Sequence, residues 1–450
     1  MMTGMTVDKR GYKVSTIVSV IKRIGYSREP FMVALRYFFI FMAVLGAIGN
    51  IRVWLLSFSF PHIFRKDFIE EFLISRAVLD GVNPYLPINK LADVFMGPLP
   101  FQVFQHPSPH PPPEALFCLP LGLLSYEDAG VVWFLFELAC LSVSLALLSR
   151  CLGAGKWMGL ASLCAFLILV WPPISAELII GQLTSLMLIL LVGAWQAVRS
   201  KKDIQGGILL GSAIAVKLVP WPIIIFLLLR RNWRASCAAV MTIAFANIAA
   251  SMLMGFDQMS QYYLKVGMSV SQIYHASTGN FSLWTIGWRM FDGTTLSDWG
   301  GGNASPLFAA PAVAPFISIA IPFAMLILGF IFSFKARTFD TSFGILICVM
   351  ILISPIAWSY FLILALIPLG ILVHSLSSLN WPRKETNIAI CVAITFFFSA
   401  RQLMPLLTGK GIAGGLVPML SFMVAMLSLL PAMGLLGLLW LLWRTDRFTP

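Results

Sequence analysis

Residues 206–229, with the sequence GGILLGSAIAVKLVPWPIIIFLLL, decide the fold class. The segment is apolar, but Lys217, Pro220 and Pro222 interrupt it. Basic residues flank it at both ends: Arg199, Lys201, Lys202, Arg230, Arg231 and Arg234. Such clusters are typical of the cytoplasmic side of a membrane, and two crossings would need about 40 residues. We therefore predict a broken helix that enters the membrane from the cytoplasm, turns inside it and returns, beside a protein-lined or water-filled cavity.

A second segment, residues 341–375, repeats this pattern. The basic residues Lys335, Arg337, Arg383 and Lys384 flank it, and the pair Ser354-Pro355 interrupts it.

The chain is 59% hydrophobic, with a mean hydropathy of +0.87, which excludes a soluble globular protein. We predict an all-α polytopic bundle with these two broken or re-entrant helix pairs and short interfacial helices in the outer loops. About eight full spans are expected, near residues 37–58, 130–149, 157–173, 182–198, 236–254, 312–334, 387–404 and 416–443.

The eight spans predict one integral membrane domain over residues 1–450, with both termini in the cytoplasm. Residues 1–36 form a basic cytoplasmic segment in which we expect no cleavable signal peptide. Two long loops, residues 59–129 and 255–311, lie on the outer side. This orientation places most of the 31 Lys and Arg residues inside and most of the 19 acidic residues outside or in the membrane, as the positive-inside rule requires. We expect a bacterial cytoplasmic membrane.

Several classes of site have no signature in the sequence. The net charge of +12 follows from the topology, so it does not indicate nucleic-acid binding. The seven cysteines lie in or beside apolar segments, and the five histidines have no metal-ligand spacing. There is no phosphate-binding glycine loop, no Ser/His/Asp set and no nucleotide-binding motif. The sequence therefore predicts neither a metal nor a cofactor, and argues against a nucleotide-sugar donor.

Residues 66–85, KDFIEEFLISRAVLDGVNPY, gather four carboxylates at the start of the first outer loop: Asp67, Glu70, Glu71 and Asp80. Asp67 at a membrane cavity could deprotonate a sugar hydroxyl, or it could be a solvated acid paired with Arg65 and Lys66. On a helix, Asp67, Glu70 and Glu71 share one face. Their proximity would raise a carboxyl pKa, which suits a base, and it would equally suit a divalent cation site.

Lys217 is an ionisable residue inside an apolar segment, and such residues are functional candidates because insertion costs about 2.5–3.5 kcal/mol. It could neutralise a lipid phosphate, or it could snorkel or pair with a buried acid such as Glu137. Among other polar candidates, Gln182 could bind a sugar or cap a helix, and Asn280 and Ser282 lie in the second outer loop. Arg289, in the same loop, suits phosphate. Trp358 and Tyr360 could stack on a sugar or lie at the membrane interface.

The motifs together resemble glycosyltransferase family 87. Asp67-Phe68 precedes the Gly81-Val82-Asn83-Pro84-Tyr85 turn, and His110-Pro111-Pro112-Pro113 precedes Leu119-Pro120-Leu121. Gly181-Gln182 follows, and then the run from Gly206 to Arg234 with Lys217 and Pro220. Gly279-Asn280 with Ser282-Leu283 and Arg289, and Ser354-Pro355 with Trp358, complete the set. The resemblance extends over residues 60–365 in the order and spacing of these motifs.

The resemblance implies a C-type membrane glycosyltransferase that uses a polyprenyl-phosphate sugar, with mannose or another hexose as the sugar. It implies that Asp67 is the catalytic base of an inverting transfer on the outer face, onto a glycan or glycolipid acceptor. Lys217 and Arg289 are then expected to bind the donor phosphate, and Gln182, Asn280, Ser282, Trp358 and Tyr360 the sugars. The chain departs from the family pattern at Ser359 and Tyr360, where an aspartate and a histidine are common.

Two other functions remain open. A transporter or flippase of lipid-linked sugars would also use broken helices and an intramembrane lysine, although its coupling charges would lie near the middle of the membrane. An enzyme of the O-antigen ligase or polymerase kind would act on the same face with a diphosphate donor. Beside Asp67, the residues Glu70, Glu71 and Asp80 are secondary acid candidates or surface groups.

Overall fold

The computed structural model describes residues 28–152, 167–294, 303–398 and 418–448. The first described region contains α2 (Arg28–Leu56), η1 (His62–Arg65), α3 (Phe68–Leu79), α4 (Ile88–Phe95), α5 (Pro112–Cys118), η2 (Leu119–Leu123) and α6 (Tyr126–Cys151). The second contains α8 (Pro172–Ile180), α9 (Thr184–Arg199), α10 (Asp203–Val216), α11 (Trp221–Leu229), α12 (Trp233–Met254), α13 (Phe256–Gln261), η4 (Tyr262–Val266), α14 (Gly267–Ile273) and α15 (Thr285–Phe291). The remainder contains α16 (Ala314–Lys335), α17 (Phe339–Leu352), η5 (Ser359–Ala365), α18 (Leu366–Ser378), α19 (Arg383–Thr395), α21 (Pro418–Leu427) and α22 (Leu430–Asp446).

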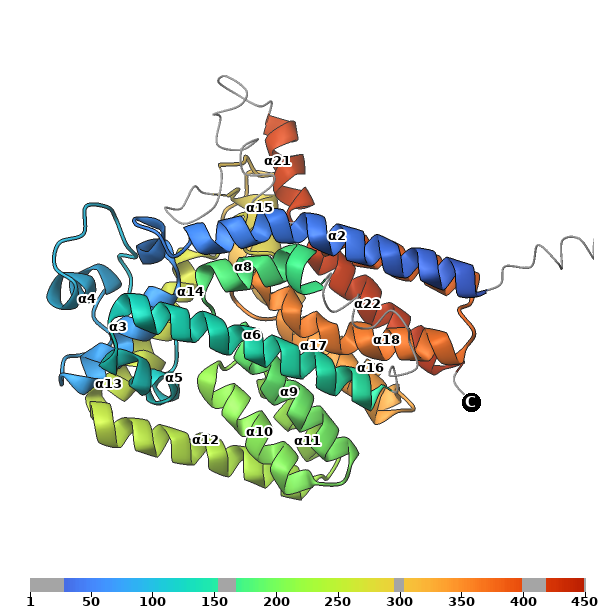
Figure 1. Cartoon of the computed structure of the whole chain (residues 1–450), viewed down its shortest axis with the longest axis horizontal. Coiled ribbons are helices and arrows are strands. Elements are labelled where there is room, and N and C mark those ends of the chain that lie inside the picture. The colour runs from blue at the N-terminus through green and yellow to red at the C-terminus, as the bar shows by residue number, and fades with distance from the viewer. Residues whose placement is uncertain (1–27, 153–166, 295–302, 399–417, 449–450) are drawn as a thin grey trace, which may run out of the picture.

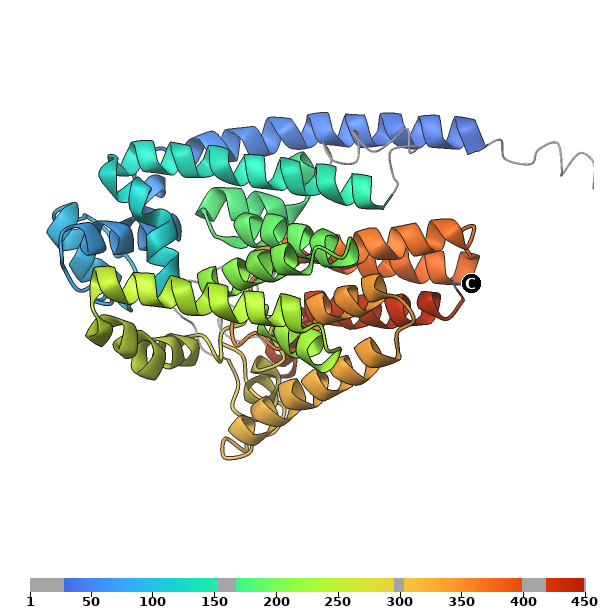
Figure 2. The same cartoon turned by 90° about the horizontal axis from the view of Figure 1, so that it is seen from below.

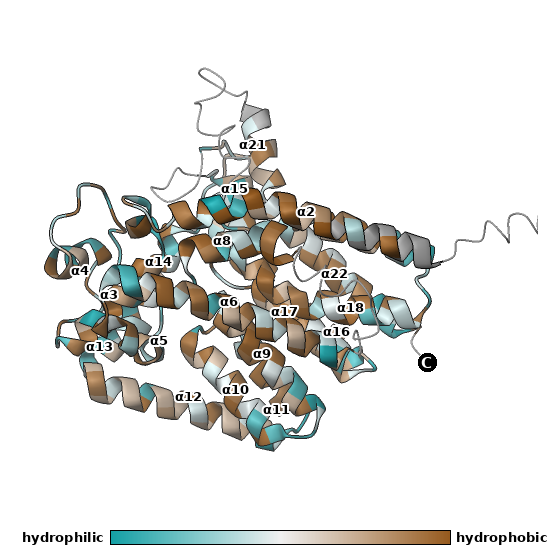
Figure 3. Cartoon of the chain, in the orientation of Figure 1, coloured by the Kyte–Doolittle hydropathy of each residue, from teal (hydrophilic) through white to brown (hydrophobic). Residues whose placement is uncertain are grey.

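The described residues are helical, as the sequence predicts. Their only pairing of β type is an isolated bridge between Thr294 and Ala304. The long helices run along one axis, and the short helices α3, α4, α5 and α13 gather at one end (Figures 1 and 2). Colouring by hydropathy shows apolar residues along the helices and hydrophilic residues concentrated at the ends of the molecule (Figure 3). This arrangement is that of a polytopic membrane protein.

Four helices in the described part of the chain are long and apolar enough to cross a membrane: Tyr126–Cys151, Trp233–Met254, Ala314–Lys335 and Ser359–Ser378. The number rises to six if each of two bent pairs is one span. One pair is α8 with α9, bent by 119°, and the other is α21 with α22, bent by 41°. The prediction of about eight spans is therefore only partly matched.

Some predicted spans differ from the observed helices. The expected single span at residues 416–443 is divided between α21 and α22, and the span at 182–198 is α9, which continues from α8 through the sharp bend. Ser359–Ser378, expected as one arm of a broken pair, is by itself long enough to span. Residues 1–27, most of the span at 157–173 and the end of the span at 387–404 lie outside the described residues.

The segment around Lys217 forms two helices, α10 and α11, and returns to the place where it starts. Asn232 Nδ2 donates a hydrogen bond of 2.9 Å to Asp203 Oδ1, so the two ends of the segment lie side by side. α10 packs tightly along α12: at Gly207 the two helices are so close that a Cβ would lie 2.2 Å from the carbonyl oxygen of Ala235. Close packing through small residues fixes the helix whose C-terminal end carries Lys217.

The first outer loop packs into a small cluster around α3. α5 and η2 contact α3, and Ala115 and Cys118 are fully buried. On the other face Phe117 and Leu123 are exposed. A buried hydrogen bond of 3.1 Å from Tyr85 Oη to the carbonyl oxygen of His110 ties the Gly81–Tyr85 turn to the proline run. The two motifs therefore form one unit that holds α3 in place.

Candidate active site

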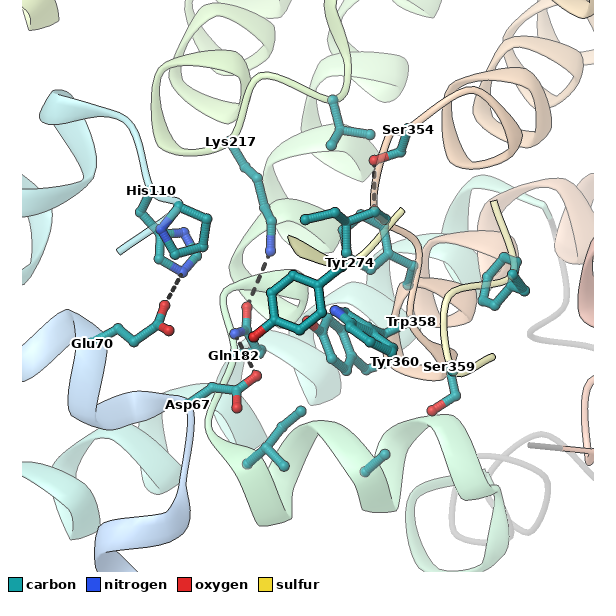
Figure 4. A pocket seen from close by; sticks show the side chains of 18 of the residues that line it. Asp67, Glu70, His110, Gln182, Lys217, Tyr274, Ser354, Trp358, Ser359 and Tyr360 are labelled. Carbon is teal, nitrogen blue, oxygen red and sulfur yellow. Dashed lines mark hydrogen bonds and ion pairs between the residues drawn. The ribbon is translucent and has the colours of Figure 1, made fainter. Parts of the chain in front are cut away.

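A cavity of about 780 Å³ lies where four interruptions of helical structure meet. These are the junction of η1 with α3, the turn between α8 and α9, the break between α10 and α11, and the loop that precedes η5. Asp67, Gln182, Lys217, Trp358 and Tyr360 all line it, although they are spread over almost 300 residues (Figure 4). The structure thus brings together five of the residues that the sequence selects.

Asp67, Gln182 and Lys217 form a hydrogen-bonded chain across the cavity (Figure 4). Gln182 Nε2 donates to Asp67 Oδ2 at 2.8 Å, and Lys217 Nζ donates to Gln182 Oε1 at 3.1 Å. Only this orientation of the Gln182 amide satisfies both neighbours, because a carboxylate accepts and an ammonium donates. Asp67 stands immediately before α3, and its side chain makes no capping bond to that helix. Its carboxylate is therefore available to the cavity.

Gly181 places Gln182 in this chain. It ends α8 with a left-handed backbone, φ +74°, which a glycine adopts without steric cost. A Cβ here would also lie 2.8 Å from Cβ of Phe68, the residue after Asp67. Trp133 Nε1 donates to the Gly181 carbonyl at 3.1 Å, and the Glu177 carboxylate accepts from the Ser185 backbone N–H at 2.6 Å. Gly181 is thus needed for both the turn and the close approach to α3, and this turn places Gln182 beside Asp67.

Lys217 lies at the C-terminal cap of α10. Its ammonium is 4.8 Å from the ring centroid of Phe361 and 5.8 Å from that of Tyr360, distances at which cation–π attraction operates. Its hydrogen bond goes to Gln182, so the structure does not support the alternative of a pair with Glu137. Lys217 therefore presents a positive charge to the cavity from the side opposite Asp67 (Figure 4).

The basic neighbours of Asp67 in sequence point in different directions. Lys66 is buried with its ammonium 3.7 Å from the Phe58 ring centroid, and burial lowers the pKa of Lys66 to about 8, against the opposing charge of Glu137. Arg65 is exposed and lines the cavity. Among the described residues neither forms an ion pair with Asp67. The interpretation of Asp67 as a solvated acid paired with its neighbours does not match this geometry.

The surroundings of Asp67 suit a base that works near neutral pH. Burial among protein atoms raises the pKa of Asp67 to about 6, and the Gln182 hydrogen bond and the Lys217 charge partly oppose this rise. The side chain still has intermediate exposure, because one side faces the cavity. At pH 7 the carboxyl is mostly ionised and can accept a proton.

Behind Asp67 lies a buried set of ionisable groups. His110 Nε2 lies 3.5 Å from Glu70 Oε2 and 3.3 Å from Glu71 Oε1, and Glu114 Oε1 accepts from Cys118 Sγ at 2.9 Å. Burial raises the pKa of Glu70 and of Glu71 well above the usual range and that of Glu114 to about 7, and burial holds the pKa of His110 well below its usual value. Burial thus favours the uncharged form of each of these groups.

The acids of the first outer loop do not share one site. Among the residues that the structure describes, no group of three or more His, Cys, Asp or Glu side chains is placed to hold a metal ion. Asp80 lies at the C-terminal cap of α3, where it forms an exposed ion pair of 3.0 Å with Arg76. Glu70 lines the cavity, whereas Glu71 and Asp80 do not.

Aromatic side chains form one wall of the cavity. Trp358 and Tyr360 line it together with Tyr274, whose ring meets that of Trp358 edge to face at 5.5 Å between centroids. Gly279 lets the indole lie close to the second outer loop, because a Cβ there would be 2.4 Å from Trp358 Cζ3. Tyr360 is nearly buried, so Trp358 offers the larger face to a sugar.

Asn280 and Ser282 were predicted to bind sugar, but they do not line the cavity and are completely buried. Asn280 Nδ2 donates to the Pro355 carbonyl at 2.9 Å, and its Oδ1 accepts from the backbone N–H of Ala357 at 2.9 Å. Ser282 Oγ donates to the Ser354 carbonyl. Both side chains therefore attach the second outer loop to the loop that carries Trp358.

Arg289 was predicted to bind phosphate, but its guanidinium is 1% exposed and engaged with the protein. It donates to the carbonyls of Asn280 at 2.6 Å, Thr278 at 3.2 Å and Ala425 at 2.7 Å, and to Ser428 Oγ at 2.7 Å. It does not line the cavity. This arrangement supports a role in holding the loop at residues 277–280 against the C-terminal end of α21.

Sequence reasoning did not select Arg65, His106 and Tyr274, which also line the cavity. His106 Nδ1 lies 2.8 Å from the Pro107 carbonyl and its Nε2 lies 2.7 Å from Tyr274 Oη. A carbonyl only accepts, so we assign the proton to Nδ1, and Tyr274 donates to Nε2. The position of Arg65, two residues before Asp67, was the one signal in the sequence that could have drawn attention to it.

One comparison with known proteins identifies the family of this chain. The family model described as Glycosyltransferase family 87 matches residues 109–355, more than half of the chain. The matched region contains Gln182 and Lys217, together with Ser354 and Pro355 of the loop that leads to Trp358. No curated protein and no solved structure matches the chain.

Proposed function

Because this chain belongs to glycosyltransferase family 87, and is therefore a glycosyltransferase with membrane helices, we propose that it transfers a sugar from a polyprenyl-phosphate donor. The acceptor is a glycan or glycolipid on the outer face of a bacterial cytoplasmic membrane, and the sugar is mannose or another hexose. The observation that carries the proposal is the chain from Asp67 through Gln182 to Lys217, which has a carboxyl group and an ammonium group on two sides of one cavity.

In the proposed reaction Asp67 accepts the proton of the acceptor hydroxyl as its oxygen attacks the anomeric carbon. The bond from that carbon to the phosphate oxygen breaks, and the phosphate keeps the electron pair. A single displacement inverts the anomeric configuration. Lys217 stabilises the charge that develops on the leaving phosphate, which is the electrostatic task that contributes most in many enzymes.

The other residues of the site have supporting roles in this proposal. Gln182 keeps the Asp67 carboxylate directed into the cavity, and Trp358 provides a face on which a sugar ring can stack. Arg289, Asn280 and Ser282 act indirectly, since they fix the loops that carry Gly279 and Trp358. Burial raises the pKa of Glu70 and of Glu71 and so favours their protonated forms, which cannot accept a proton from the acceptor.

A flippase or transporter is the second candidate, and an enzyme with a diphosphate donor is the third. In favour of transfer over transport, the raised pKa of Asp67, about 6, suits proton abstraction at a site that also holds the ammonium group of Lys217. A diphosphate donor would bring a second phosphate group, and Lys217 and Arg65 are the only Lys and Arg side chains among the described residues that line the cavity.

The test is an assay in reconstituted vesicles with a labelled polyprenyl-phosphate mannose and membrane glycolipids as acceptors. We expect labelled glycolipid and an equal amount of released polyprenyl phosphate. Label that crosses the bilayer without a new glycosidic bond would identify a flippase instead. Transfer from a polyprenyl-diphosphate sugar alone would favour the ligase or polymerase reaction.

A further inference from the structure

Arg65 is a charged residue of the cavity that the proposed mechanism does not use. It ends η1, and Asp67 follows two residues later. Lys66 between them turns into the protein interior, whereas Arg65 and Asp67 both line the cavity. The junction of η1 and α3 therefore presents a guanidinium and a carboxyl group to the same space.

The guanidinium of Arg65 is available for a ligand. In the structure, over the described residues, it makes no hydrogen bond or ion pair, and its one aromatic neighbour is Phe101, with 5.8 Å between Cζ and the ring centroid. Lys217, the other Lys or Arg of the described cavity lining, already bonds Gln182. A free guanidinium offers five N–H donors, whose planar geometry matches a carboxylate or a phosphate.

The reaction geometry decides which substrate Arg65 meets. In a single displacement the attacking hydroxyl and the leaving phosphate lie on opposite sides of the anomeric carbon. Asp67 marks the acceptor side and Lys217 the phosphate side, and Figure 4 shows them on either side of Gln182. Arg65 lies two residues before Asp67 at the junction of η1 and α3, so we assign its charge to the acceptor side.

We infer that Arg65 binds an anionic group of the acceptor, and that the acceptor is therefore an acidic glycan or glycolipid that carries a phosphate or a carboxylate. This inference rests on the proposed function, because it uses Asp67 to identify the acceptor side. Arg65 is a specificity-determining residue in this account. Its contribution is to acceptor binding, while the donor meets Lys217.

The experiment divides membrane glycolipids by anion exchange into neutral and acidic fractions and supplies each with labelled polyprenyl-phosphate mannose. We expect the wild type to label the acidic fraction. Arg65→Gln should raise the acceptor KM roughly tenfold or more, with the donor KM unchanged, because a charge-assisted bidentate contact is lost. Arg65→Lys should fall between the two. Arg76→Gln is the matched control, since Arg76 is an arginine of the same outer loop that pairs with Asp80 and does not line the cavity.

The two sources of negative charge are separated by repeating the anion exchange at about pH 2, where carboxylates are protonated and phosphodiesters keep their charge. Label confined to the neutral fraction would overturn the inference but leave the proposed function intact. The same holds if Arg65→Gln changes only the donor KM, or behaves like Arg76→Gln. Absence of transfer to either fraction by the wild type would overturn the proposed function, and this inference with it.

Discussion

The side-chain amide of Gln182 donates a hydrogen bond of 2.8 Å to Oδ2 of Asp67. The two residues are 115 positions apart, and the contact exists because Gly181 lets the chain turn against Phe68. The same amide accepts from Lys217, so its position depends on the two charged groups that it separates. A glutamine in this place orients the base and keeps it apart from the cation without neutralising either one.

The pH dependence of transfer should follow the Asp67 carboxyl. Since burial raises the pKa of Asp67 to about 6, the rate should fall about tenfold for each pH unit below that value as the base becomes protonated. The Gln182 hydrogen bond lowers this pKa, so Gln182→Leu should move the acidic limb of the profile of kcat/KM to higher pH. An unmoved limb would contradict the assignment. Gln205→Leu, at an exposed glutamine of α10, is the control and should leave the profile unchanged.

Gly181→Ala should reduce both stability and activity. The left-handed backbone alone costs an L residue about 1–2 kcal/mol, and the new Cβ would lie 2.8 Å from Phe68 Cβ. Because Phe68 follows Asp67, the strain should displace the base from Gln182. Thermal unfolding in detergent and the transfer rate measure the two effects. Gly130→Ala, where a Cβ would meet its neighbours at 3.8 Å or more, should be nearly neutral, and equal behaviour of the two variants would refute this explanation.

Arg289→Gln should destabilise the protein by about 3 kcal/mol or more, because several buried carbonyl groups lose a charged donor. The expected result is a lower unfolding temperature with an unchanged donor KM in the fraction that remains folded. A stable variant with a greatly raised donor KM would instead support phosphate binding by Arg289. Lys265→Gln, an exposed change in the same outer loop, should alter neither quantity.

One residue of the candidate site, Lys217, could be selected from the sequence because a charged side chain is unusual in an apolar segment. Lys217 stands in an apolar segment, where a lysine is costly to insert into a membrane, and this conflict is visible in the sequence without the tertiary structure. The helical character and the break at residues 217–220 follow from the same segment. Hydropathy did not reveal the bend between α21 and α22, since an apolar run has the same hydropathy whether it is straight or bent by 41°. The signal for it in the sequence was Pro431, which stands in the first turn of α22.

The predicted roles that differ most from the geometry are those of polar residues in the second outer loop. Asn280, Ser282 and Arg289 look alike in sequence whether they face a ligand or hold backbone carbonyls, because both tasks need hydrogen-bonding side chains. Only the packing of this loop against the Ser354–Trp358 loop and α21 decides between the two. Arg65 was overlooked for a related reason: a neighbouring acid in sequence suggested an ion pair that the η1–α3 junction does not form.

The most direct measurement of the central claim is the rate of sugar transfer by Asp67→Asn. Asparagine keeps the size of the side chain but accepts a proton poorly, so we expect a loss of about 10²–10⁴-fold in kcat, with unchanged folding and membrane insertion. Asp80→Asn, at the other end of α3, should retain the wild-type rate. Wild-type transfer by Asp67→Asn would contradict the account.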